Sequence, residues 1–524
     1  MIKKLIILGI LLLVSVPAFG QHLDTAWVRI YDGPYTSGYD RAKAIAVDDS
    51  GNVHVTGFID ATKYGGGGDY ATIKYDPKGI SLWLNTYNGP GDYTDVATDI
   101  AVDDSGNVFV TGYSSSISMD YYTIGYDKDG GLLGYNRYDG PAGGSDQARA
   151  IAVDGSGNVY VTGYSDGGGG GTGYDFATIK YDLFLFRTWV RRYSSGTGYT
   201  WDEATAIAVD GSGNVYVTGF SGGYPNNNYT TIKYDASGTQ LWVVGYNGPG
   251  YGEDKAYAIA VDGSGNVYVT GYSEGSGTER DYATIKYNSS GVQQWVRRYN
   301  GPGNGRDEAT AIAVDSCSNV YVTGVSEGDY LTIKYDASGN LVCSALYNGP
   351  GNGYDRATDI VLEGCNNFFV TGYSGGTGTN YDYATIRYDS SCNQIWVRRY
   401  NGSGNSGDEA NAIAFGFAKN RYGNIYVTGY SVVSWENYAT IRYAQFKCGD
   451  ANCDGKVSVS DVTWLINYLF QGGPPPCPIP QSGDVNCDGT ISVADVTYLI
   501  NYLFKGGPPP CDTNNDGVPD CYGQ

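Results

Sequence analysis

Short runs of alternating apolar and polar residues, each ending in a polar turn, follow one another along most of the chain. The pattern is clearest over residues 202–246, where the segments AIAVD, NVYVTG, YTTIKYD and QLWVVGY succeed one another. Alternation with a period of two predicts strands with one buried face, and the Asp, Gly, Ser and Asn residues between them predict turns. The sequence therefore predicts a unit of four short strands, here called A to D.

This unit recurs eight times with a period of about 53 residues. The tripeptide Val-Thr-Gly in strand B marks the copies, with its threonine at Thr56, Thr111, Thr162, Thr218, Thr270, Thr323, Thr371 and Thr428. Repeats of this length with four strands are typical of β-propeller blades. We predict a mainly β chain with an eight-bladed propeller over residues 21–445, and seven blades with one irregular unit is the alternative.

The strand order predicts how the ring closes. Trp27–Tyr31 has the pattern of a D strand, whereas the eighth copy ends after its C strand, Thr440–Tyr443. Pairing of these two segments would complete the last blade and remove two exposed edges. A tryptophan marks most D strands, and Leu133 and Cys343 are expected to replace it in two copies.

One face of the propeller is predicted to carry recognition. The A–B turns are nearly constant, whereas the B–C loops vary in length between Val325–Tyr330 and Phe58–Tyr70. Variable loops on a constant scaffold are the usual place for binding. An aspartate opens every A strand on this face, and Asp or Asn precedes every C strand, as at Asp69, Asp281 and Asn437. These carboxylates could form a ring that binds a ligand, or each could accept backbone hydrogen bonds within its own loop. Because every blade repeats them, the second, structural interpretation is favoured.

The propeller sequence contains no recognisable catalytic motif. It has two histidines and lacks the motifs of serine hydrolases and zinc proteases. The acids that depart from the repeat are the remaining candidates for a general acid and base. They are Glu253, Glu274, Glu279, Glu327 and Glu436.

Composition and the N-terminus indicate export. Residues 1–20 combine Lys3 and Lys4 with an apolar run and a small-residue site, which is typical of a secretory signal peptide. The formal net charge of −22 argues against nucleic-acid binding. Ten cysteines in an exported chain predict disulfides. The expected pairs are Cys317–Cys343, Cys365–Cys392, Cys453–Cys477, Cys487–Cys511 and Cys448–Cys521.

The C-terminal region has a different pattern, which predicts two calcium loops. The twelve residues from Asp450 to Asp461 recur almost unchanged from Asp484 to Asp495, and oxygen-bearing residues stand at the spacing of an EF-hand loop. The predicted ligands of two calcium ions are Asp450, Asn452, Asp454, Lys456 (by its carbonyl), Ser458 and Asp461, and Asp484, Asn486, Asp488, Thr490 (by its carbonyl), Ser492 and Asp495. Each loop is followed by a predicted helix, Val462–Phe470 or Val496–Phe504, whose apolar stripe predicts a small all-α domain over residues 446–511. Residues 512–524 form an acidic tail.

Both regions resemble known families. The motifs DGSGNVYVTGYS and YATIKYD resemble the SBBP-type β-propeller repeat and, more loosely, the NHL repeat, and the likeness covers residues 22–445. The two loop–helix repeats, with aspartate at position 12 and no helix before either loop, resemble a type I dockerin. This resemblance implies calcium-dependent binding to a cohesin domain of another protein. It also implies that loop positions 10 and 11, which are Val459, Ser460, Val493 and Ala494, help to select the cohesin.

Three functions remain open at this point. We expect an extracellular or surface-bound propeller that binds a protein or a glycan and is docked to a larger assembly through the dockerin-like domain. The first alternative is a dockerin-tethered carbohydrate-active enzyme, either a glycoside hydrolase or a lyase that degrades polysaccharide. The second alternative is a structural spacer of a surface layer. A role as an enzyme is the less favoured expectation, because no unique pair of acids is evident.

Overall fold

The computed structural model describes residues 22–34, 38–60, 67–167, 173–196, 200–223, 226–250, 252–365, 367–417, 423–433, 435–446, 451, 457–474, 476, 483–486, 490–505, 507 and 510. The chain divides into two compact units, one of which comprises Thr25–Lys419 and Gly423–Tyr443. This unit is the propeller, and the other unit contains the two helices. The predicted signal peptide, residues 1–20, and the acidic tail lie outside the described residues. Within the described segments, we find no helix with the length and apolar character needed to cross a membrane.

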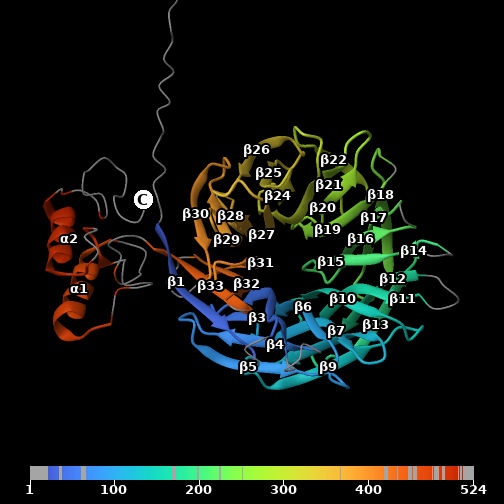
Figure 1. The fold of residues 1–524 in the computed structure, drawn as a ribbon, viewed down its shortest axis with the longest axis horizontal. Helices are drawn as coiled ribbons and strands as arrows, with labels where there is room; N and C mark the ends of the chain where they lie inside the picture. The colour runs from blue at the N-terminus through green and yellow to red at the C-terminus, as the bar shows by residue number, and fades with distance from the viewer. Residues whose placement is uncertain are drawn as a thin grey trace, which may run out of the picture. The chain divides into compact units, whose positions relative to one another are not determined.

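Eight antiparallel sheets form the propeller, and they surround a central axis (Figure 1). The prediction of eight blades is confirmed, and the seven-bladed alternative is wrong. The first four blades contain β2 (Arg41–Val47), β3 (Val53–Asp60), β4 (Gly68–Tyr75) and β5 (Ser81–Tyr87); β6 (Asp95–Val102), β7 (Val108–Ser115), β8 (Met119–Tyr126) and β9 (Leu132–Tyr138); β10 (Asp146–Val153), β11 (Val159–Asp166), β12 (Gly173–Tyr181) and β13 (Arg187–Tyr193); and β15 (Glu203–Val209), β16 (Val215–Ser221), β17 (Asn228–Tyr234) and β18 (Gln240–Tyr246). A short strand, β14 (Thr200–Trp201), pairs in parallel with β12.

The other four blades have the same order. They contain β19 (Asp254–Val261), β20 (Val267–Glu274), β21 (Arg280–Tyr287) and β22 (Gln293–Tyr299); β23 (Asp307–Val314), β24 (Val320–Ser326), β25 (Asp329–Tyr335) and β26 (Leu341–Tyr347); β27 (Asp355–Glu363), β28 (Asn367–Gly375), β29 (Tyr381–Tyr388) and β30 (Gln394–Tyr400); and β31 (Glu409–Phe417), β32 (Gly423–Val432), β33 (Glu436–Phe446) and β1 (His22–Tyr31). The second unit contains α1 (Val459–Gln471) and α2 (Val493–Lys505).

The first strand of the chain closes the ring, as the sequence predicts. β1 is hydrogen-bonded to β33, so the last blade combines the two ends of the propeller sequence. Trp27 on β1 is buried and packs against Tyr75 of the first blade and Tyr426 of the last blade. The closing strand therefore contributes core as well as backbone pairing.

The Val-Thr-Gly anchor has a structural explanation. In every blade, the threonine hydroxyl lies 2.8–3.0 Å from the hydroxyl of a threonine on strand C, as between Thr56 and Thr72. The following glycine leaves room for a backbone carbonyl and a tyrosine. At Gly57, a Cβ atom would lie 2.0 Å from the carbonyl oxygen of Arg41 and 2.9 Å from the hydroxyl of Tyr438. A side chain at this position is therefore excluded.

Buried tyrosines on strand C join neighbouring blades. The hydroxyl of Tyr70, for example, donates to the carbonyl of Tyr122 in the next blade at 3.1 Å, and Tyr438 of the last blade donates to Ala71 of the first at 3.3 Å. Seven blades carry this bond, while the third has Phe176 at the position. These tyrosines thus bury their rings between blades, and their hydroxyls still have a hydrogen-bond partner in the next blade.

The outer strands carry a second type of contact between blades. Trp295 on β22 lies opposite Lys286, and both side chains donate to the carbonyl of Ala337 in the next C–D turn, at 3.4 and 2.9 Å. In the second blade, Gly134 rather than Leu133 stands at the tryptophan position, because it pairs with Gly125 as Trp83 pairs with Lys74. The expectation for Leu133 was therefore wrong by one residue. Leu185 of the following C–D turn fills the space beside Gly125.

The disulfide prediction was wrong for the propeller. Cys343 bonds to Cys392 in the next blade, and Cys317 and Cys365 are free thiols. The expected pairs Cys317–Cys343 and Cys365–Cys392 lie within single blades, whereas Cys343 on β26 bonds to the C–D turn of the next blade, and the turn that carries Cys317 lies beside the turn that carries Cys365. The six cysteines of the other expected pairs, from Cys448 to Cys521, lie outside the described residues.

Candidate functional sites

The variable loops share one face of the propeller, called the loop face below. In five blades the aspartate at the end of the D–A loop is hydrogen-bonded to the B–C region of the preceding blade, as where the N–H of Asp254 donates to the carbonyl of Asn227 at 2.8 Å. The same contact joins Asp202 to Tyr174 and Asp408 to Tyr381. Loops of unequal length therefore lie side by side around this face, where a ligand could meet several blades at once.

The aspartates that open the A strands shape these loops. All eight are fully buried, and each accepts backbone N–H groups; Asp355, for example, accepts from Gly349 at 2.7 Å and Gly375 at 2.8 Å. Burial raises the pKa of Asp40 to about 6, although the N–H groups of Gly33 and Asp60 act in the opposite direction. The structural interpretation of this repeated set is supported, and the eight residues are Asp40, Asp95, Asp146, Asp202, Asp254, Asp307, Asp355 and Asp408.

The acids that precede strand C are also part of the scaffold in several blades. Asp281 pairs with Arg298 at 2.6 Å, and the equivalent pairs Asp175–Arg192 and Asp382–Arg399 have separations of 2.8 Å. Each arginine also donates to the serine that follows Val-Thr-Gly-Tyr. Asp69 differs, because burial and the nearby charges of Asp95, Asp92 and Asp60 raise its pKa to about 7.

A β-bulge in every A strand adds one residue at the same point of the blade. The register against strand B shifts by one residue at the same place in all eight blades. In five blades the bulged residue bridges to the next blade, as where the hydroxyl of Thr205 donates to the carbonyl of Ala256 at 2.9 Å. In the other three blades it is Lys43, Arg149 or Tyr257. Bulges often direct functional side chains, so these three larger residues mark the inner rim of the loop face.

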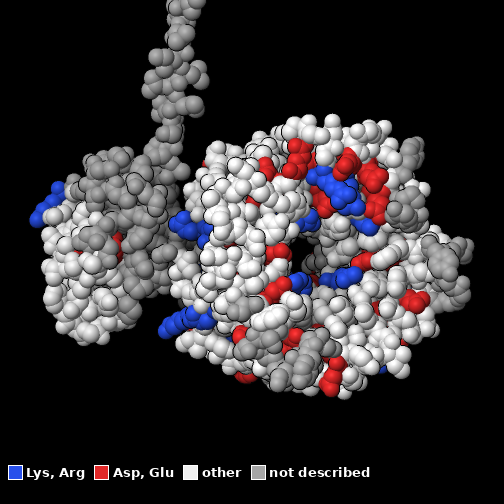
Figure 2. All heavy atoms as spheres, in the orientation of Figure 1, with Lys and Arg blue, Asp and Glu red and all other residues white. Residues whose placement is uncertain are grey.

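An ion-pair network joins three blades at this inner rim. Glu253 pairs with Lys255 at 3.1 Å and with Arg280 at 3.0 Å. Glu308 pairs with Arg280 at 2.5 Å and with Arg356 at 3.3 Å. We call these five residues the rim network. Figure 2 shows acidic and basic side chains intermingled around the central opening of the ring. The side chains of the network are only 13–26% exposed, so their mutual attraction is screened less than at an open surface.

A cluster of aromatic side chains lies on the loop face between the third and fourth blades. The rings of Tyr164 and Tyr174 are 4.6 Å apart, and those of Tyr174 and Trp201 are 5.5 Å apart. Arg149 lies over Tyr164, and Glu203 accepts from both Arg149 and Trp201 at 2.8 and 2.9 Å. We call these five residues the aromatic cluster. Trp201 is 49% exposed, although it is held in place from two sides.

A related arrangement stands where the ring closes. Trp435 and Tyr39 are 41% and 50% exposed, and their rings meet edge to face at 5.8 Å. Arg41 is ion-paired with Glu436 and lies 4.6 Å from the centre of the Tyr430 ring. Exposed aromatic rings beside fixed arginines and carboxylates are typical of binding surfaces.

Most of the acids that depart from the repeat have partners in the structure. Glu253 belongs to the rim network, Glu436 pairs with Arg41, and Glu279 pairs with Arg306 at the exposed surface. Glu327 accepts from the N–H of Gly303. Burial alone would raise the pKa of Glu253, but Lys255, Tyr272 and Arg280 outweigh it and lower that pKa. A general acid needs the opposite shift.

The sequence did not reveal two half-buried carboxylates on the A strands, Asp99 and Asp359. Asp99 and Asp359 replace the alanine that most A strands have after the bulge, and this substitution was the available signal. Asp99 accepts from the N–H groups of Ile100 and Ile151 at 2.8 and 2.9 Å, and Asp359 accepts from Ile360 and Ile413 at the same distances. Burial raises the pKa of Asp99 to about 7 and that of Asp359 to about 6. Each carboxylate joins two adjacent blades.

The helical unit contains two copies of one arrangement. Val462 and Leu465 on α1 and Val496 and Leu499 on α2 are buried in a common core with Val485. The apolar stripes thus form a mutual core, as expected, and the helices begin three residues before the predicted starts, at Val459 and Val493. Ser458 caps α1 and accepts from the N–H of Ser460.

The described loop residues fit a hard cation. Asp461 and Asp495, both fully buried, occupy position 12, and each accepts the N–H of the serine three residues earlier at 2.8 Å. Asp484 is 2% exposed, and its charge is among the causes, after burial, that raise the pKa of Asp495. Two buried carboxylates whose charges repel each other favour a bound cation with oxygen ligands. Asn486, Thr490 and Ser492 are described as well, while Asp450, Asn452, Asp454, Lys456 and Asp488 lie outside the described residues.

Two family models match the chain. One is the dockerin type I domain, over residues 448–504, and the other is a β-propeller repeat of the SBBP family, over residues 86–117, 135–171, 248–277 and 294–330. The chain contains SBBP propeller repeats and a type I dockerin domain. Type I dockerins bind calcium, imply a cohesin partner and typically occur on secreted proteins.

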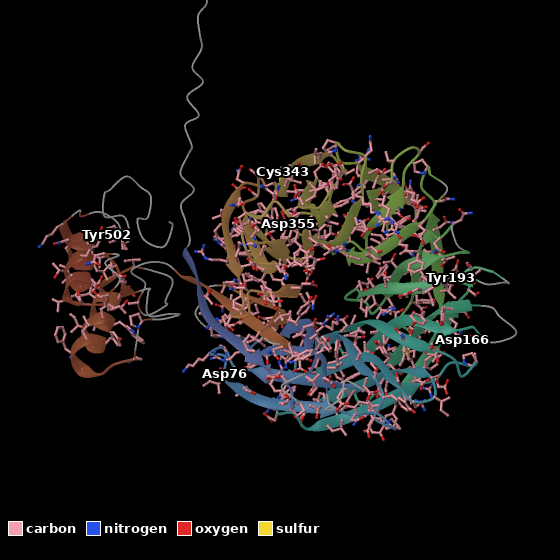
Figure 3. All side chains as sticks on the ribbon, in the orientation of Figure 1. Asp76, Asp166, Tyr193, Cys343, Asp355 and Tyr502 are labelled. Carbon is pink, nitrogen blue, oxygen red and sulfur yellow. A yellow bond between two sulfur atoms is a disulfide. The ribbon has the colours of Figure 1, made fainter. Side chains whose placement is uncertain are left out.

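The positions that the dockerin resemblance links to cohesin choice lie in the first turn of each helix. Val459 and Val493 are 53% and 55% exposed, and Ser460 and Ala494 follow them. Phe470 and Phe504, near the ends of the two helices, are each 65% exposed. Figure 3 shows Tyr502, another exposed aromatic residue of α2. The dockerin domain thus presents matching exposed residues on both of its halves.

Some solved structures resemble the chain weakly. They include a protein from Lactobacillus plantarum (13% identity, covering 62% of this chain and 91% of that one, TM-score 0.39), the polysaccharide lyase Uly1 (14%, 66% and 89%, 0.39) and prolyl oligopeptidase B from Galerina marginata (10%, 74% and 55%, 0.40). Likeness at this level carries no argument about function. No curated protein matched the chain significantly.

Proposed function

We propose that this chain is an exported binding protein, docked through its dockerin domain to a cohesin and presenting the loop face of its propeller to a protein or glycan ligand. The aromatic cluster carries the proposal. It offers an exposed tryptophan and two tyrosines in fixed positions, with Arg149 and Glu203 available for polar contacts. A preformed surface of this kind loses little side-chain entropy when a ligand binds.

Calcium would be held by the two loops of the dockerin domain. Asp461, Asp484 and Asp495 are the described carboxylates of the proposed ligand set, and the other oxygen donors of both loops named above would complete it. When bound, calcium would neutralise clustered carboxylates that otherwise repel one another. The helices then present Val459, Ser460, Val493 and Ala494 to a cohesin.

The pairing of the off-pattern acids favours binding over hydrolysis. An acid that protonates a glycosidic oxygen needs a raised pKa, whereas the pKa of Glu253 is lowered by its cationic partners. The rim network instead provides fixed charges of both signs, which suits recognition of a polar ligand.

A binding screen on the full-length protein tests the proposal. Purified protein is applied to a glycan array and to an array of extracellular proteins, and each hit is repeated with Trp201→Ala and Trp435→Ala. We expect these variants to weaken binding at least tenfold. Phe186→Ala is the matched control, because Phe186 is 70% exposed but lies in a C–D turn. Equal binding by all three variants would contradict the assignment of the loop face.

A further inference from the structure

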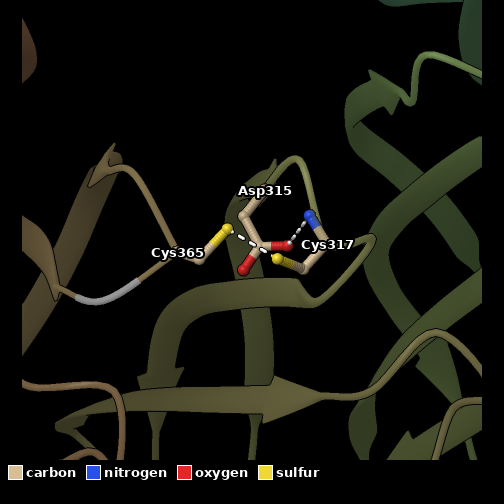
Figure 4. A group of neighbouring side chains, drawn as sticks. All are labelled: Asp315, Cys317 and Cys365. Carbon is tan, nitrogen blue, oxygen red and sulfur yellow. Dashed lines mark hydrogen bonds between the residues drawn. The ribbon is translucent and has the colours of Figure 1, made fainter.

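Two thiols meet on the face opposite the variable loops. Cys317 lies in the A–B turn between β23 and β24, and Cys365 lies in the equivalent turn between β27 and β28 of the next blade. Both occupy the place that Ser212 has in the common Asp-Gly-Ser-Gly-Asn turn. Figure 4 shows their side chains extending toward each other across the boundary between the two blades.

The geometry favours a covalent bond between them. The two Sγ atoms are 2.7 Å apart, which is closer to the length of a disulfide, about 2.05 Å, than to an ordinary packing distance. Cys317 is exposed, so an oxidant can reach the pair from solvent. We propose that Cys317 and Cys365 form a second disulfide in the mature protein, in addition to Cys343–Cys392. The two disulfides would then link the sixth and seventh blades covalently at two places.

A metal ion bound by the two thiols is the alternative to a disulfide. Asp315 lies within 4.8 Å of both sulfurs and could in principle complete a three-ligand site. Its oxygens, however, already accept from the N–H groups of Cys317 and Asn319, from the Asn319 amide and from the Tyr321 hydroxyl. Asp154, Asp210 and Asp262 make the same set of bonds in blades without cysteine. Asp315 is therefore committed to its turn, which favours a disulfide over a metal site.

The boundary between these two blades lacks one contact that other blades have, and the A–B turn of the seventh blade lacks a second one. Cys343 replaces the tryptophan whose indole donates to the next C–D turn. In the seventh blade, Glu363 replaces the turn aspartate and Phe369 replaces the tyrosine that donates to it, so this hydroxyl–carboxylate bond is missing there. Glu363 pairs with Arg387 on strand C instead. Cys343–Cys392 holds the first of these places to the neighbouring blade, and a bond between Cys317 and Cys365 would do the same for the second.

The oxidation follows ordinary thiol–disulfide exchange. Hydrogen bonds from Cys317 and from the Ser316 hydroxyl lower the pKa of the Cys365 thiol, so Cys365 is the first to deprotonate. Its thiolate attacks a disulfide of an exchange protein or a small-molecule disulfide, forms a mixed disulfide and releases one thiol. Cys317 then loses its proton and displaces the second thiol. The pair gives up two electrons and two protons, and the oxidant is reduced to two thiols.

Peptide mapping of the exported, full-length protein tests the proposal. Free thiols are alkylated in denaturant without reductant, and the chain is then digested and analysed by mass spectrometry. We expect a linked peptide pair that contains Cys317 and Cys365, and no alkylation at either residue until reductant is added. Alkylation of both residues before reduction, or bonds from either one to another cysteine, would overturn the assignment.

Two further measurements separate the disulfide from a metal site and from a chance contact. Metal analysis of the same sample should find no soft metal that depends on Cys317, and a metal lost in Cys317→Ser would overturn the proposal. In Cys317→Ser, which restores the serine of the common turn, Cys365 should become fully alkylated without reductant, while Cys343–Cys392 stays intact. Cys365 remaining protected in that variant would mean that it has another partner.

Discussion

Cys343 bonds to Cys392 at the place where other blades set a tryptophan against the following C–D turn. The Cα atoms of the two residues are 5.9 Å apart, and Figure 3 shows Cys343 at the outer edge of the ring, whereas Asp355 lies farther in. Lys334, opposite Cys343 on strand C, still donates to the carbonyl of Ser390 in the same turn at 2.9 Å. A covalent bond has therefore replaced one of two contacts that normally anchor a blade to its neighbour.

This replacement predicts the outcome of a repair experiment. Cys343→Ser should lower the free energy of unfolding by about 2–5 kcal/mol, because a disulfide that closes a long loop is lost. The double variant Cys343→Trp/Cys392→Ser should recover part of the loss, since the indole can again donate to the C–D turn. Thermal unfolding followed by circular dichroism measures both effects. A double variant no more stable than Cys343→Ser would show that the two anchors are not equivalent.

Closure of the ring predicts that Trp27 contributes strongly to the stability of the propeller, although it lies near the N-terminus. It is 7% exposed and packs against blades at both ends of the propeller sequence. Trp27→Ala should lower the free energy of unfolding by about 3–5 kcal/mol, as for other large core side chains. Ile30→Ala on the same strand is the control, because Ile30 is 43% exposed. Deletion of residues 21–32 should be more damaging than either substitution, and similar melting temperatures for all variants would contradict this closure.

The sequence was sufficient for the blades because each copy repeats the same local chemistry. The threonine pair, the glycine that admits a neighbouring carbonyl and the turn aspartates recur in all or most copies, so their roles could be inferred from repetition. What depends on neighbouring blades could not. The partners of Cys343 and Glu308 lie in adjacent blades, and no spacing along the chain shows which segments come together in the ring. The bulge at Arg149 and Tyr257 was missed for a related reason, since a single extra residue in a short strand has no sequence marker of its own.

Burial of the rim network predicts unequal effects for two arginines. Arg280 joins Glu253 to Glu308 and its side chain is 26% exposed, whereas Arg306, paired with Glu279, is 69% exposed. Arg280→Ala should lower the free energy of unfolding by about 1–3 kcal/mol, because it leaves two half-buried carboxylates together. Arg306→Ala should cost less than about 1 kcal/mol. Urea unfolding of both variants provides the comparison, and equal losses would mean that the network is only a surface feature.

The raised pKa of Asp69 predicts a dependence of stability on pH. Burial, and then the charges of Asp95, Asp92 and Asp60, raise that pKa from 3.8 to about 7 in the folded state. A folded-state pKa above the unfolded value stabilises the fold fully below the unfolded pKa, and this contribution is lost as the pH rises through about 7. Asp69→Asn should therefore be less sensitive than the wild type to a change from pH 5 to pH 8. Urea unfolding at several pH values measures the difference.

A matched variant separates this effect from a general change in charge. Asp104→Asn removes an exposed carboxylate and should keep the pH dependence of the wild type. Asp99 and Asp359 also have raised pKa values, of about 7 and about 6. The Asp69→Asn variant should therefore still lose some stability as the pH rises, but less than the wild type. A pH dependence in Asp69→Asn identical to that of the wild type would contradict the assignment.

The buried carboxylates of the dockerin domain predict that calcium stabilises its helices. Asp484 and Asp495 are buried at 2% and 0% exposure, and their repulsion should be relieved when a cation binds between them. Calorimetric titration of the full-length protein should detect calcium binding, and Asp484→Ala should remove the heat that belongs to the second loop. The variant should also lose helical circular dichroism in calcium, while the propeller transition stays unchanged. Asp104→Ala is the control for loss of one acidic residue, and a flat titration with helices intact in chelator would mean that the loops do not bind calcium.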